Sequence, residues 1–503
     1  MKNYKYISLL FITVILSCSK FDEINKDPYA SDRVPEEMLA AKTLIETFKF
    51  WNPNPFDFST GNLWNKHIAW TTTWSNPYQY YYSWWPYGGF GYKRLTDLKL
   101  MVEYSREKES YSSYQGLEKF MKAWYGFSST LEMGDIPYSE AGMADEGILR
   151  PKYDKQEDVF KYILEDLKKA EAFFAEGKQF QGDVMFDGDA SKWQKLCNAM
   201  QLKVLQTMSK KAGNEHKARF AEIIASGKLM TGNTDNFQLK YFGTDNSHHP
   251  FWNGASQRRE TVLTSLLVDE LKKNKDRRLF YFADPAPDLI DAGKREDDFE
   301  AYAGADPTRV PWELADENNS YSHINQRYVD DKTGDPMLRF TYAEQCFIIA
   351  EGLEEGWAPG NAKDYYEKGV KAMLEYYMNL PSAANTHGMA ITQDYIDNYF
   401  TGEAAYKTGG TKQDRLRQIL VQRWFIDFFQ GNGGNYAQFL RTGYPEYPLD
   451  PATSQNPDDK TVYPKRWKYP EGEHTQNPDN YQKAVNEQFN GYDGINGVPW
   501  YLK

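Results

Sequence analysis

Acidic residues that lie close together are the first candidates for chemistry. Asp183, Asp187 and Asp189 fall in one short segment that also contains Gly182 and Gly188. Carboxylate oxygens are the ligands that Ca²⁺ prefers, but this spacing departs from that of an EF-hand loop. The segment is therefore interpreted as a solvated turn ahead of a helix, and no metal site is predicted.

Short motifs that carry common catalytic chemistries are missing from the sequence. The seven histidines form no His-Glu-x-x-His pair, and neither Gly-x-Ser-x-Gly nor a Gly-x4-Gly-Lys-Ser/Thr phosphate loop occurs. Glycoside hydrolysis needs two carboxyl groups about 5–9 Å apart, yet nothing singles out one pair among the 71 Asp and Glu residues. The chain is predicted not to be an enzyme and to need no cofactor. A surface glycoside hydrolase is the less favoured alternative.

Aromatic side chains supply a stronger signal, because they make up 16% of a chain whose mean hydropathy is −0.74. Tyr and Trp combine an apolar ring with a polar edge, so they can stack on sugars while Asn, Asp and Arg bind hydroxyls. The rings that lie among polar and turn-forming residues are the predicted ligand contacts: Trp74, Tyr78, Tyr80, Trp252, Trp312 and Tyr321. The alternative for each ring is ordinary packing against a scaffold.

Helices must position these rings, since apolar residues recur with a period near 3.6 along much of the chain. This periodicity predicts helices over residues 117–131, 156–174, 191–208, 262–271 and 416–429. Asp154, with Glu157 three residues later, is the expected N-cap of the second of them.

A helix pair is predicted between residues 340 and 377, with its turn at Pro359-Gly360. The spacing of Ala350, Ala362, Tyr366 and Gly369 is similar to that of a tetratricopeptide repeat, although the expected Trp and second Tyr are missing.

Long irregular stretches separate the helices, over residues 51–92, 232–259, 284–336 and 431–503. Loops longer than about 15 residues are uncommon and are usually functional. No low-complexity linker divides the chain, so residues 18–503 are expected to form a single domain, a helical scaffold with loop-rich excursions.

The N-terminus has the pattern of a secretory signal peptide over residues 1–17. Lys2 and Lys5 precede an apolar run, Ile7–Ser17, which is too short for the roughly 20 residues that a membrane span needs. The next residue, Cys18, completes a sequence that resembles a bacterial lipobox, so Cys18 is the predicted lipidation site. Acyl chains would hold the protein on a membrane, and the acidic pair Asp22-Glu23 resembles a surface-export signal.

Net charge and cysteine content narrow the class of protein further. The net charge of −12 disfavours nucleic acid as a partner. Cys197 and Cys346 are two cysteines inside apolar patterns and predict no disulfide framework.

Several motifs, in the same order along the chain, resemble those of the SusD/RagB-like family. They are Gly134–Ala141 (Gly-Asp-Ile-Pro-Tyr-Ser-Glu-Ala), Gly188–Trp193, Asp276–Leu279, Thr341–Glu351, Arg441–Pro445 and Pro464–Pro470. Two departures stand out, since Leu440-Arg441 replaces a paired Arg and Asp276-Arg277-Arg278 replaces Asp-Pro-Arg. Most of these motif residues are interpreted as structural.

The resemblance implies an all-α fold, with tetratricopeptide-like helical pairs as the scaffold and the irregular excursions forming the ligand-binding side. It implies a lipoprotein on the extracellular face of the outer membrane. Such a protein captures oligosaccharide and acts as the lid of a SusC-like TonB-dependent transporter. Capture of oligopeptides by the same architecture, or a structural lid with no ligand contact of its own, are the alternatives within the family.

Overall fold

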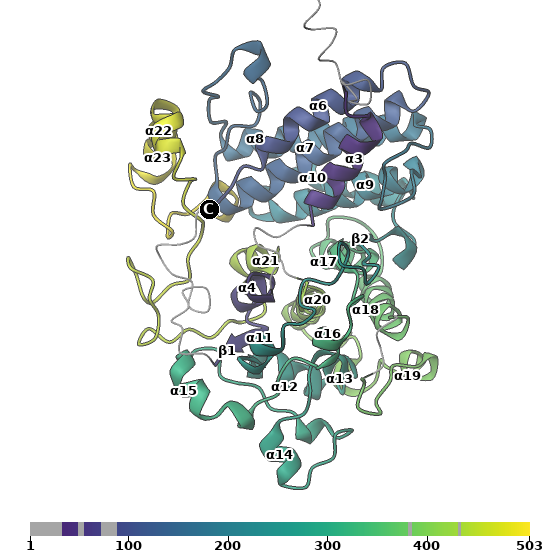
Figure 1. Ribbon diagram of the computed structural model, residues 1–503, viewed down its shortest axis with the longest axis vertical. Coiled ribbons are helices and arrows are strands. Elements are labelled where there is room, and N and C mark those ends of the chain that lie inside the picture. Colours follow the sequence, from purple (N-terminus) through teal and green to yellow (C-terminus); the bar gives the residue numbers. More distant parts are fainter. Residues whose placement is uncertain (1–32, 49–54, 72–87, 381–384, 431–433) are drawn as a thin grey trace, which may run out of the picture.

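The computed structural model describes residues 33–48, 55–71, 88–380, 385–430 and 434–503, with backbone alone for 55–58 and 434. Helices dominate it, in two groups that Figure 1 shows one above the other. Among the described helices, none combines the length and the hydropathy needed to cross a bilayer.

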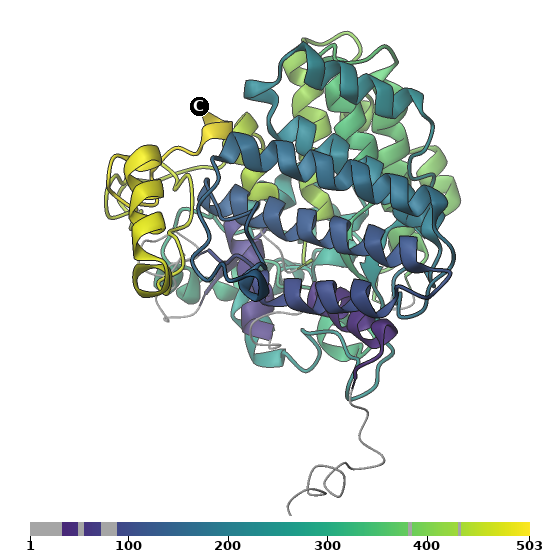
Figure 2. The same cartoon turned by 90° about the horizontal axis from the view of Figure 1, so that it is seen from above.

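The first group is an array of antiparallel neighbours that Figure 2 shows side by side, and each of these helices contacts the next one in the array. Its members are α3 (Glu36–Glu46), α6 (Leu95–Tyr104), α7 (Tyr111–Met133), α8 (Gln156–Glu176), α9 (Ala190–Thr207) and α10 (Asn214–Ala225). Helices α7 and α8 each bury a stripe at helical spacing, for example Phe160, Ile163 and Leu167 on α8.

The predicted N-cap of α8 is wrong. The helix starts at Gln156 after Lys155, with no side-chain cap. Asp154 instead accepts hydrogen bonds from the backbone N–H groups of Tyr138 (3.1 Å) and Ser139 (2.7 Å). The Asp154 carboxylate therefore stabilises the turn after α7. This turn and the start of α8 compete for the same side chain, and the side chain binds the turn.

The predicted helix pair in residues 340–377 is confirmed as α17 (Tyr342–Glu354) and α18 (Ala362–Met378). The Thr341 side chain caps α17 at the N–H of Glu344, and Asn361 caps α18. A Cβ on Gly369 would lie 2.7 Å from the Phe347 ring, so the missing side chain lets the two helices approach closely. α20 (Lys412–Ile426) packs on α17, and α21 (Gly434–Thr442) follows it.

Two short antiparallel ribbons interrupt the helices. β1 (Ile68–Trp70) pairs with β3 (Thr261–Leu263), and β2 (Phe237–Leu239) pairs with β4 (Met337–Phe340). The helix predicted over 262–271 therefore begins too early, because Thr261–Leu263 is a strand and α12 runs from Ser265 to Lys273. In so short a run, the apolar residues at positions 262 and 263 fit both the strand period of about 2 residues and the helix period of about 3.6.

The remaining elements are short helices and turns within the excursions. They are α4 (Pro55–Trp64), α11 (Ala255–Arg259), α13 (Arg278–Phe282), α14 (Pro287–Asp291), α15 (Pro311–Asp316), α16 (Arg327–Asp330), α19 (Gln393–Asp397), α22 (Glu473–Gln476) and α23 (Pro478–Phe489), with 3-10 turns η2 (Tyr92–Arg94), η3 (Ala144–Glu146), η4 (Ser209–Lys211), η5 (Asn233–Asp235), η6 (Phe299–Ala301), η7 (Asn318–Ser320), η8 (Gly402–Ala404) and η9 (Trp500–Leu502).

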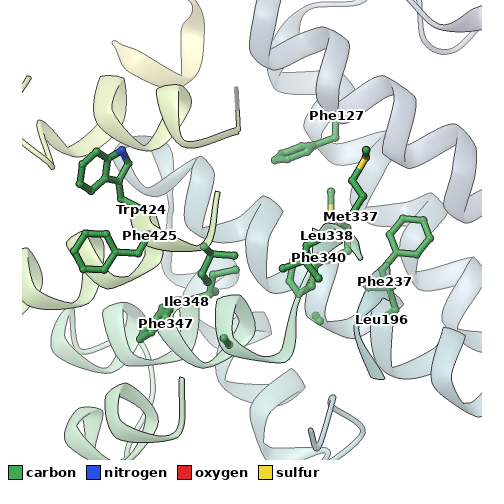
Figure 3. Packing of buried hydrophobic residues seen from close by; sticks show 14 of the residues in the cluster. Phe127, Leu196, Phe237, Met337, Leu338, Phe340, Phe347, Ile348, Trp424 and Phe425 are labelled. Carbon is green, nitrogen blue, oxygen red and sulfur yellow. The ribbon is translucent and has the colours of Figure 1, made fainter. Parts of the chain in front are cut away.

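One apolar core joins both helix groups (Figure 3). Phe127 and Leu196 come from the first group, Phe347 and Trp424 from the second, and Phe237 of β2 lies among them. Phe237 makes edge contacts with the rings of Trp124 and Trp193 at 5.4 and 5.7 Å. The β2–β4 ribbon is therefore anchored in the scaffold, and the loops next to it start from a fixed base.

Candidate ligand-binding site

A large cavity, of about 1160 Å³, lies beside strand β2, and we call it the β2 cavity. The loop between α8 and α9 forms one wall, and β2 with the residues that follow it forms another. The lining residues are Ile45, Phe48, Asp183, Val184, Met185, Asp187, Lys192, Thr234, Asn236, Gln238–Phe242, Asp245–His248 and Pro250. Drug-sized ligands occupy pockets of about 300–1000 Å³, so this space can hold several sugar units or a short peptide.

Two apolar side chains at the edge of this cavity are exposed to solvent. The exposed fraction is 79% for Phe242 and 45% for Val184. Grouped exposed apolar surface marks sites where a ligand or partner binds. Phe242 is therefore positioned to stack on a ligand that enters the cavity.

Polar groups in the wall can accept and donate hydrogen bonds. The buried Oε1 atom of Gln238 has no hydrogen-bond partner among the described residues, although such an atom normally has one. The Nζ atom of Lys192 donates to the carbonyl of Thr234 at 3.0 Å, and the exposed Lys240 also lines the cavity. Because this oxygen is buried, the Gln238 side chain must rotate toward the cavity before a ligand hydroxyl can reach it.

The acidic segment predicted to be a turn stabilises this wall. Asp183 accepts from the backbone N–H groups of Met185, Phe186 and Gly188 and from the indole Nε1 of Trp193. Burial nevertheless raises the pKa of Asp183. The Asp189 side chain caps α9. Within the described part of the chain, no cluster of three His, Cys, Asp or Glu side chains is arranged to hold a metal ion.

Among the predicted contacts that the structure describes, Trp252 is the one that packs against a residue of the cavity lining. Its half-buried ring is 5.2 Å from that of His248, a lining residue. The Nζ atom of Lys332 sits 4.7 Å from the centre of the Trp252 ring and also binds Asp245 of the lining. Trp252 therefore lies next to the lining of the β2 cavity without being part of it. Its neighbour His249 is fully buried, which lowers the pKa of that imidazole to about 4 and keeps it neutral.

Trp312 and Tyr321 do not line the β2 cavity. Trp312 lies on α15 with an exposed fraction of 49%, and Tyr321 packs on a small separate cluster that includes Leu314. The Tyr321 hydroxyl donates to Glu317 and accepts from Arg309. Trp74, Tyr78, Tyr80 and Cys18 lie outside the described residues.

Sequence reasoning missed Gln238, Tyr241 and Phe242. Strand alternation would not have found them as a set, because five consecutive residues from Gln238 to Phe242 line the cavity and β2 ends at Leu239. Tyr241 and Phe242 follow the strand in an irregular segment that has no readable period.

Paired helices with a ligand-sized cavity among their excursions define a helical-repeat binding protein. The chain matches, over residues 31–470, the SusD-like family model described as starch-binding associating with outer membrane. It belongs to the SusD-like family.

Solved structures agree with this assignment. A SusD homolog from Bacteroides fragilis is 36% identical, with a TM-score of 0.87 over 93% of this chain and 100% of that one. An outer membrane protein from Bacteroides vulgatus, whose description connects it with nutrient binding, is 30% identical, with a TM-score of 0.83 over 93% and 100%. A chitin-binding protein is 25% identical, with a TM-score of 0.72 over 92% and 98%. A search of curated proteins gave no match.

The expected all-α, tetratricopeptide-like fold is therefore confirmed, as is the resemblance on which it rested. SusD-like proteins are binding proteins without catalytic activity, and this chain is an outer-membrane-associated nutrient-binding protein.

Proposed function

We propose that this protein is a lipoprotein, anchored through Cys18 on the extracellular face of the outer membrane, which captures an oligosaccharide in the β2 cavity. It delivers the ligand to a SusC-like TonB-dependent transporter and acts as its lid. The observation that carries the proposal is the cavity itself, with the exposed Phe242 ring at its edge and the unpartnered Gln238 oxygen in its wall.

A neutral oligosaccharide fits this combination better than a charged ligand. A flat ring covers the C–H face of a sugar, while amide, ammonium and carboxylate groups bind its hydroxyls. Hydrogen bonds to neutral hydroxyls exchange with water at a net gain of only about 1 kcal/mol each. Weak binding suits a protein that must release its ligand. Chitin oligosaccharides are the first to test, because one relative is a chitin-binding protein.

Binding of the soluble chain from Ser19 onward to oligosaccharide and peptide panels tests this function, by calorimetry and Trp fluorescence. Saturable oligosaccharide binding that weakens at least tenfold in Phe242→Ala is expected, with no release of reducing ends. Leu149→Ala is the matched control, because Leu149 is 77% exposed but does not line the cavity.

Two results would overturn the proposal. Binding of peptides alone would replace the ligand class. Oligosaccharide binding that is unchanged in Phe242→Ala and Gln238→Ala would move the site elsewhere. Trp74→Ala, Tyr78→Ala and Tyr80→Ala then test the remaining proposed contacts.

A further inference from the structure

The exposed Phe242 ring is carried by a short hairpin, residues 242–247, which we call the rim hairpin. The backbone N–H groups of Phe242 and Thr244 both donate to the carbonyl of Ser247, at 3.1 and 3.2 Å, and the Ser247 N–H donates back to Thr244 at 3.1 Å. Thr244 and Ser247 therefore pair as an antiparallel bridge. These bonds lie within the rim hairpin, so they define its shape but not its position at the β2 cavity.

The segment between α16 and β4 supports the rim hairpin. Gly243, with a φ of +69°, lies so close to this segment that a Cβ would be 2.9 Å from the Thr333 hydroxyl oxygen. The N–H of His249, just after the hairpin, donates to the carbonyl of Lys332 at 2.9 Å. A Cβ on Gly334 would lie 2.5 Å from that of His249. The hairpin and its flank are therefore packed directly against residues 332–334.

The Lys332 side chain adds a charged contact to this support. Its Nζ atom binds the Asp245 carboxylate at 2.5 Å and lies over the Trp252 ring, 4.7 Å from the ring centre. The face of an indole ring carries negative potential and attracts an ammonium group. One cation thus joins Asp245 of the rim hairpin to Trp252, which follows the hairpin in the chain.

The contacts of Trp252 define a supporting role for its ring. The ring is half-buried and contacts the ring of His248 at 5.2 Å, and the backbone N–H of Trp252 donates to the carbonyl of His249 at 3.0 Å. The Lys332 ammonium occupies one face of the indole, so that face is not open to a sugar. The ring is therefore placed to hold Lys332.

The pair between Asp245 and Lys332 depends on charge. The hydrogen bond from Lys332 lowers the pKa of the Asp245 carboxyl, so both groups are ionised at neutral pH. The Asp245 side chain is 94% exposed, and salt screens the attraction between exposed charges. An exposed pair contributes little to global stability, so its loss should loosen the hairpin and leave the scaffold folded. A loop that is already held in its binding position favours tighter binding.

We propose that Lys332 is a positioning residue of the β2 cavity, which holds the rim hairpin through Asp245 and Trp252 and so keeps Phe242 at the edge of the cavity. This inference rests on the proposed capture of an oligosaccharide in that cavity. Lys332 is not among the lining residues, so it acts through Phe242 and not on the sugar. It follows that capture weakens as ionic strength rises, although the oligosaccharide is uncharged.

Hydrogen exchange of the ligand-free soluble chain tests the positioning directly, on the peptide that covers residues 240–250. Lys332→Met keeps a side chain of similar length without its charge, and should speed exchange in this peptide at least threefold at low salt. Lys332→Arg keeps the charge and should restore slow exchange. Unchanged exchange in Lys332→Met would overturn the proposal.

Lys272→Met is the matched control for these variants. The Lys272 side chain is also largely covered, binds the exposed carboxylate of Glu300 at 3.0 Å and does not line the β2 cavity. Its replacement removes one ion pair of the same kind and should leave exchange in residues 240–250 unchanged. Faster exchange there in Lys272→Met as well would show a general loss of stability and would overturn the specific role of Lys332.

Calorimetric binding of chitohexaose tests the consequence for capture. Lys332→Met should weaken binding at least threefold at low salt, and the difference from the unmodified chain should shrink at high salt, where the pair is screened. In the Phe242→Ala background, Lys332→Met should have no further effect, because Lys332 acts through that ring. Additive losses would make Lys332 a direct contact and would overturn the positioning role.

Failure of this inference can be distinguished from failure of the proposed function. Binding that weakens in Phe242→Ala but is unchanged in Lys332→Met would overturn the role of Lys332 alone. Binding that is unchanged in Phe242→Ala would overturn the capture site at the rim hairpin, and the role of Lys332 with it.

Discussion

At the scale of single residues, two carboxylates with little contact with solvent differ in how they are compensated. Asp276 is paired with the guanidinium of Arg278, and both side chains are fully buried. Glu132 has no such partner and accepts from a backbone N–H. Removing a partner from a buried pair costs several kcal/mol, whereas neutralising an unpaired carboxylate removes a cost. Removing the partner of Asp276 should therefore lower the free energy of unfolding, whereas neutralising Glu132 should raise it.

Glu132→Gln is expected to stabilise the ligand-free protein at pH 8 and to have little effect at pH 5. The folded-state pKa of Glu132, about 7, is above its ordinary value of 4.5. The folded chain thus holds an extra proton between those values, and stability falls as the pH rises through this window. At 1.36 kcal/mol per pKa unit, the cost removed is at most about 3 kcal/mol.

Denaturant unfolding of both proteins at the two pH values measures this effect. The difference between the variant and the unmodified chain isolates Glu132, because every other group titrates in both. Asp427→Asn should behave in the same direction, although Lys203, Arg423 and Glu344 also act on Asp427. A stability difference that is equal at pH 5 and pH 8 would contradict the raised pKa.

Asp154→Ala tests whether the Gly134–Ala141 motif is structural. The carboxylate receives two backbone N–H groups and the Ser139 hydroxyl, and each buried donor left without a partner costs about 1–3 kcal/mol. We expect a loss of about 2–4 kcal/mol in the free energy of unfolding, measured with denaturant, and unchanged ligand affinity. Asp158→Ala, a half-exposed carboxylate in the first turn of α8, should lose less than about 1 kcal/mol. Lost affinity without lost stability would assign the motif to the ligand site.

At the scale of the elements, the helix pairs depend on small residues at their contacts. In the α17–α18 pair, a Cβ on Gly369 would approach the Phe347 ring to 2.7 Å. Gly369→Ala is expected to destabilise the protein by about 1–2 kcal/mol in thermal or denaturant unfolding. The reason is that overpacking of about 1–3 kcal/mol exceeds the gain in helix propensity, which is below about 1 kcal/mol. Lys363→Ala on the exposed side of α18 should be neutral within about 0.5 kcal/mol, and a stabilised Gly369→Ala would show that the helices separate easily.

The predictions from sequence succeeded where an element repeats its pattern over several turns. α7, α8 and α9 bury residues at every turn, so their periodicity is unambiguous. β2 and β3 have three residues each, too few to separate a period of 2 from one of 3.6. The Asp154 carboxylate binds the turn between α7 and α8 instead of capping α8 as expected. Which of these two roles the side chain takes depends on tertiary contacts.

The candidate site was less predictable than the fold for a related reason. Trp252 and Tyr321 were both predicted as contacts from their polar neighbours. The Trp252 ring lies beside His248 of the cavity lining, whereas Tyr321 packs beside Leu314. Exposure of a ring depends on what the rest of the chain places over it. Phe242 and Gln238 became site candidates only because the loop between α8 and α9, some 50 residues earlier in the chain, lines the same cavity.

At the scale of the whole molecule, the anchor and the capture site are separate parts of the proposed function. Replacement of Cys18 by Ala removes the acylated thiol, and with it the burial of acyl CH₂ groups at about 0.8 kcal/mol each. The variant is expected to leave the membrane fraction while binding oligosaccharide with unchanged affinity as a purified protein. Cell fractionation measures the first effect and calorimetry the second. A variant that stays in the outer membrane fraction would show that the transporter alone retains it.

Capture and transporter docking can be separated in cells by the Phe242→Ala variant. Phe242 has few contacts of its own, since 79% of its surface is exposed, so its loss should leave the scaffold and any docking surface intact. Under the capture proposal, the SusC-like transporter should co-purify with the variant as it does with the unmodified protein, while uptake of the oligosaccharide falls at least fivefold at low concentration and recovers at high concentration. The recovery is expected because a weaker site is filled again by mass action. A purely structural lid predicts unchanged uptake at every concentration. Loss of co-purification together with uptake would instead place Phe242 at the transporter interface, so the two measurements on one variant distinguish the three roles.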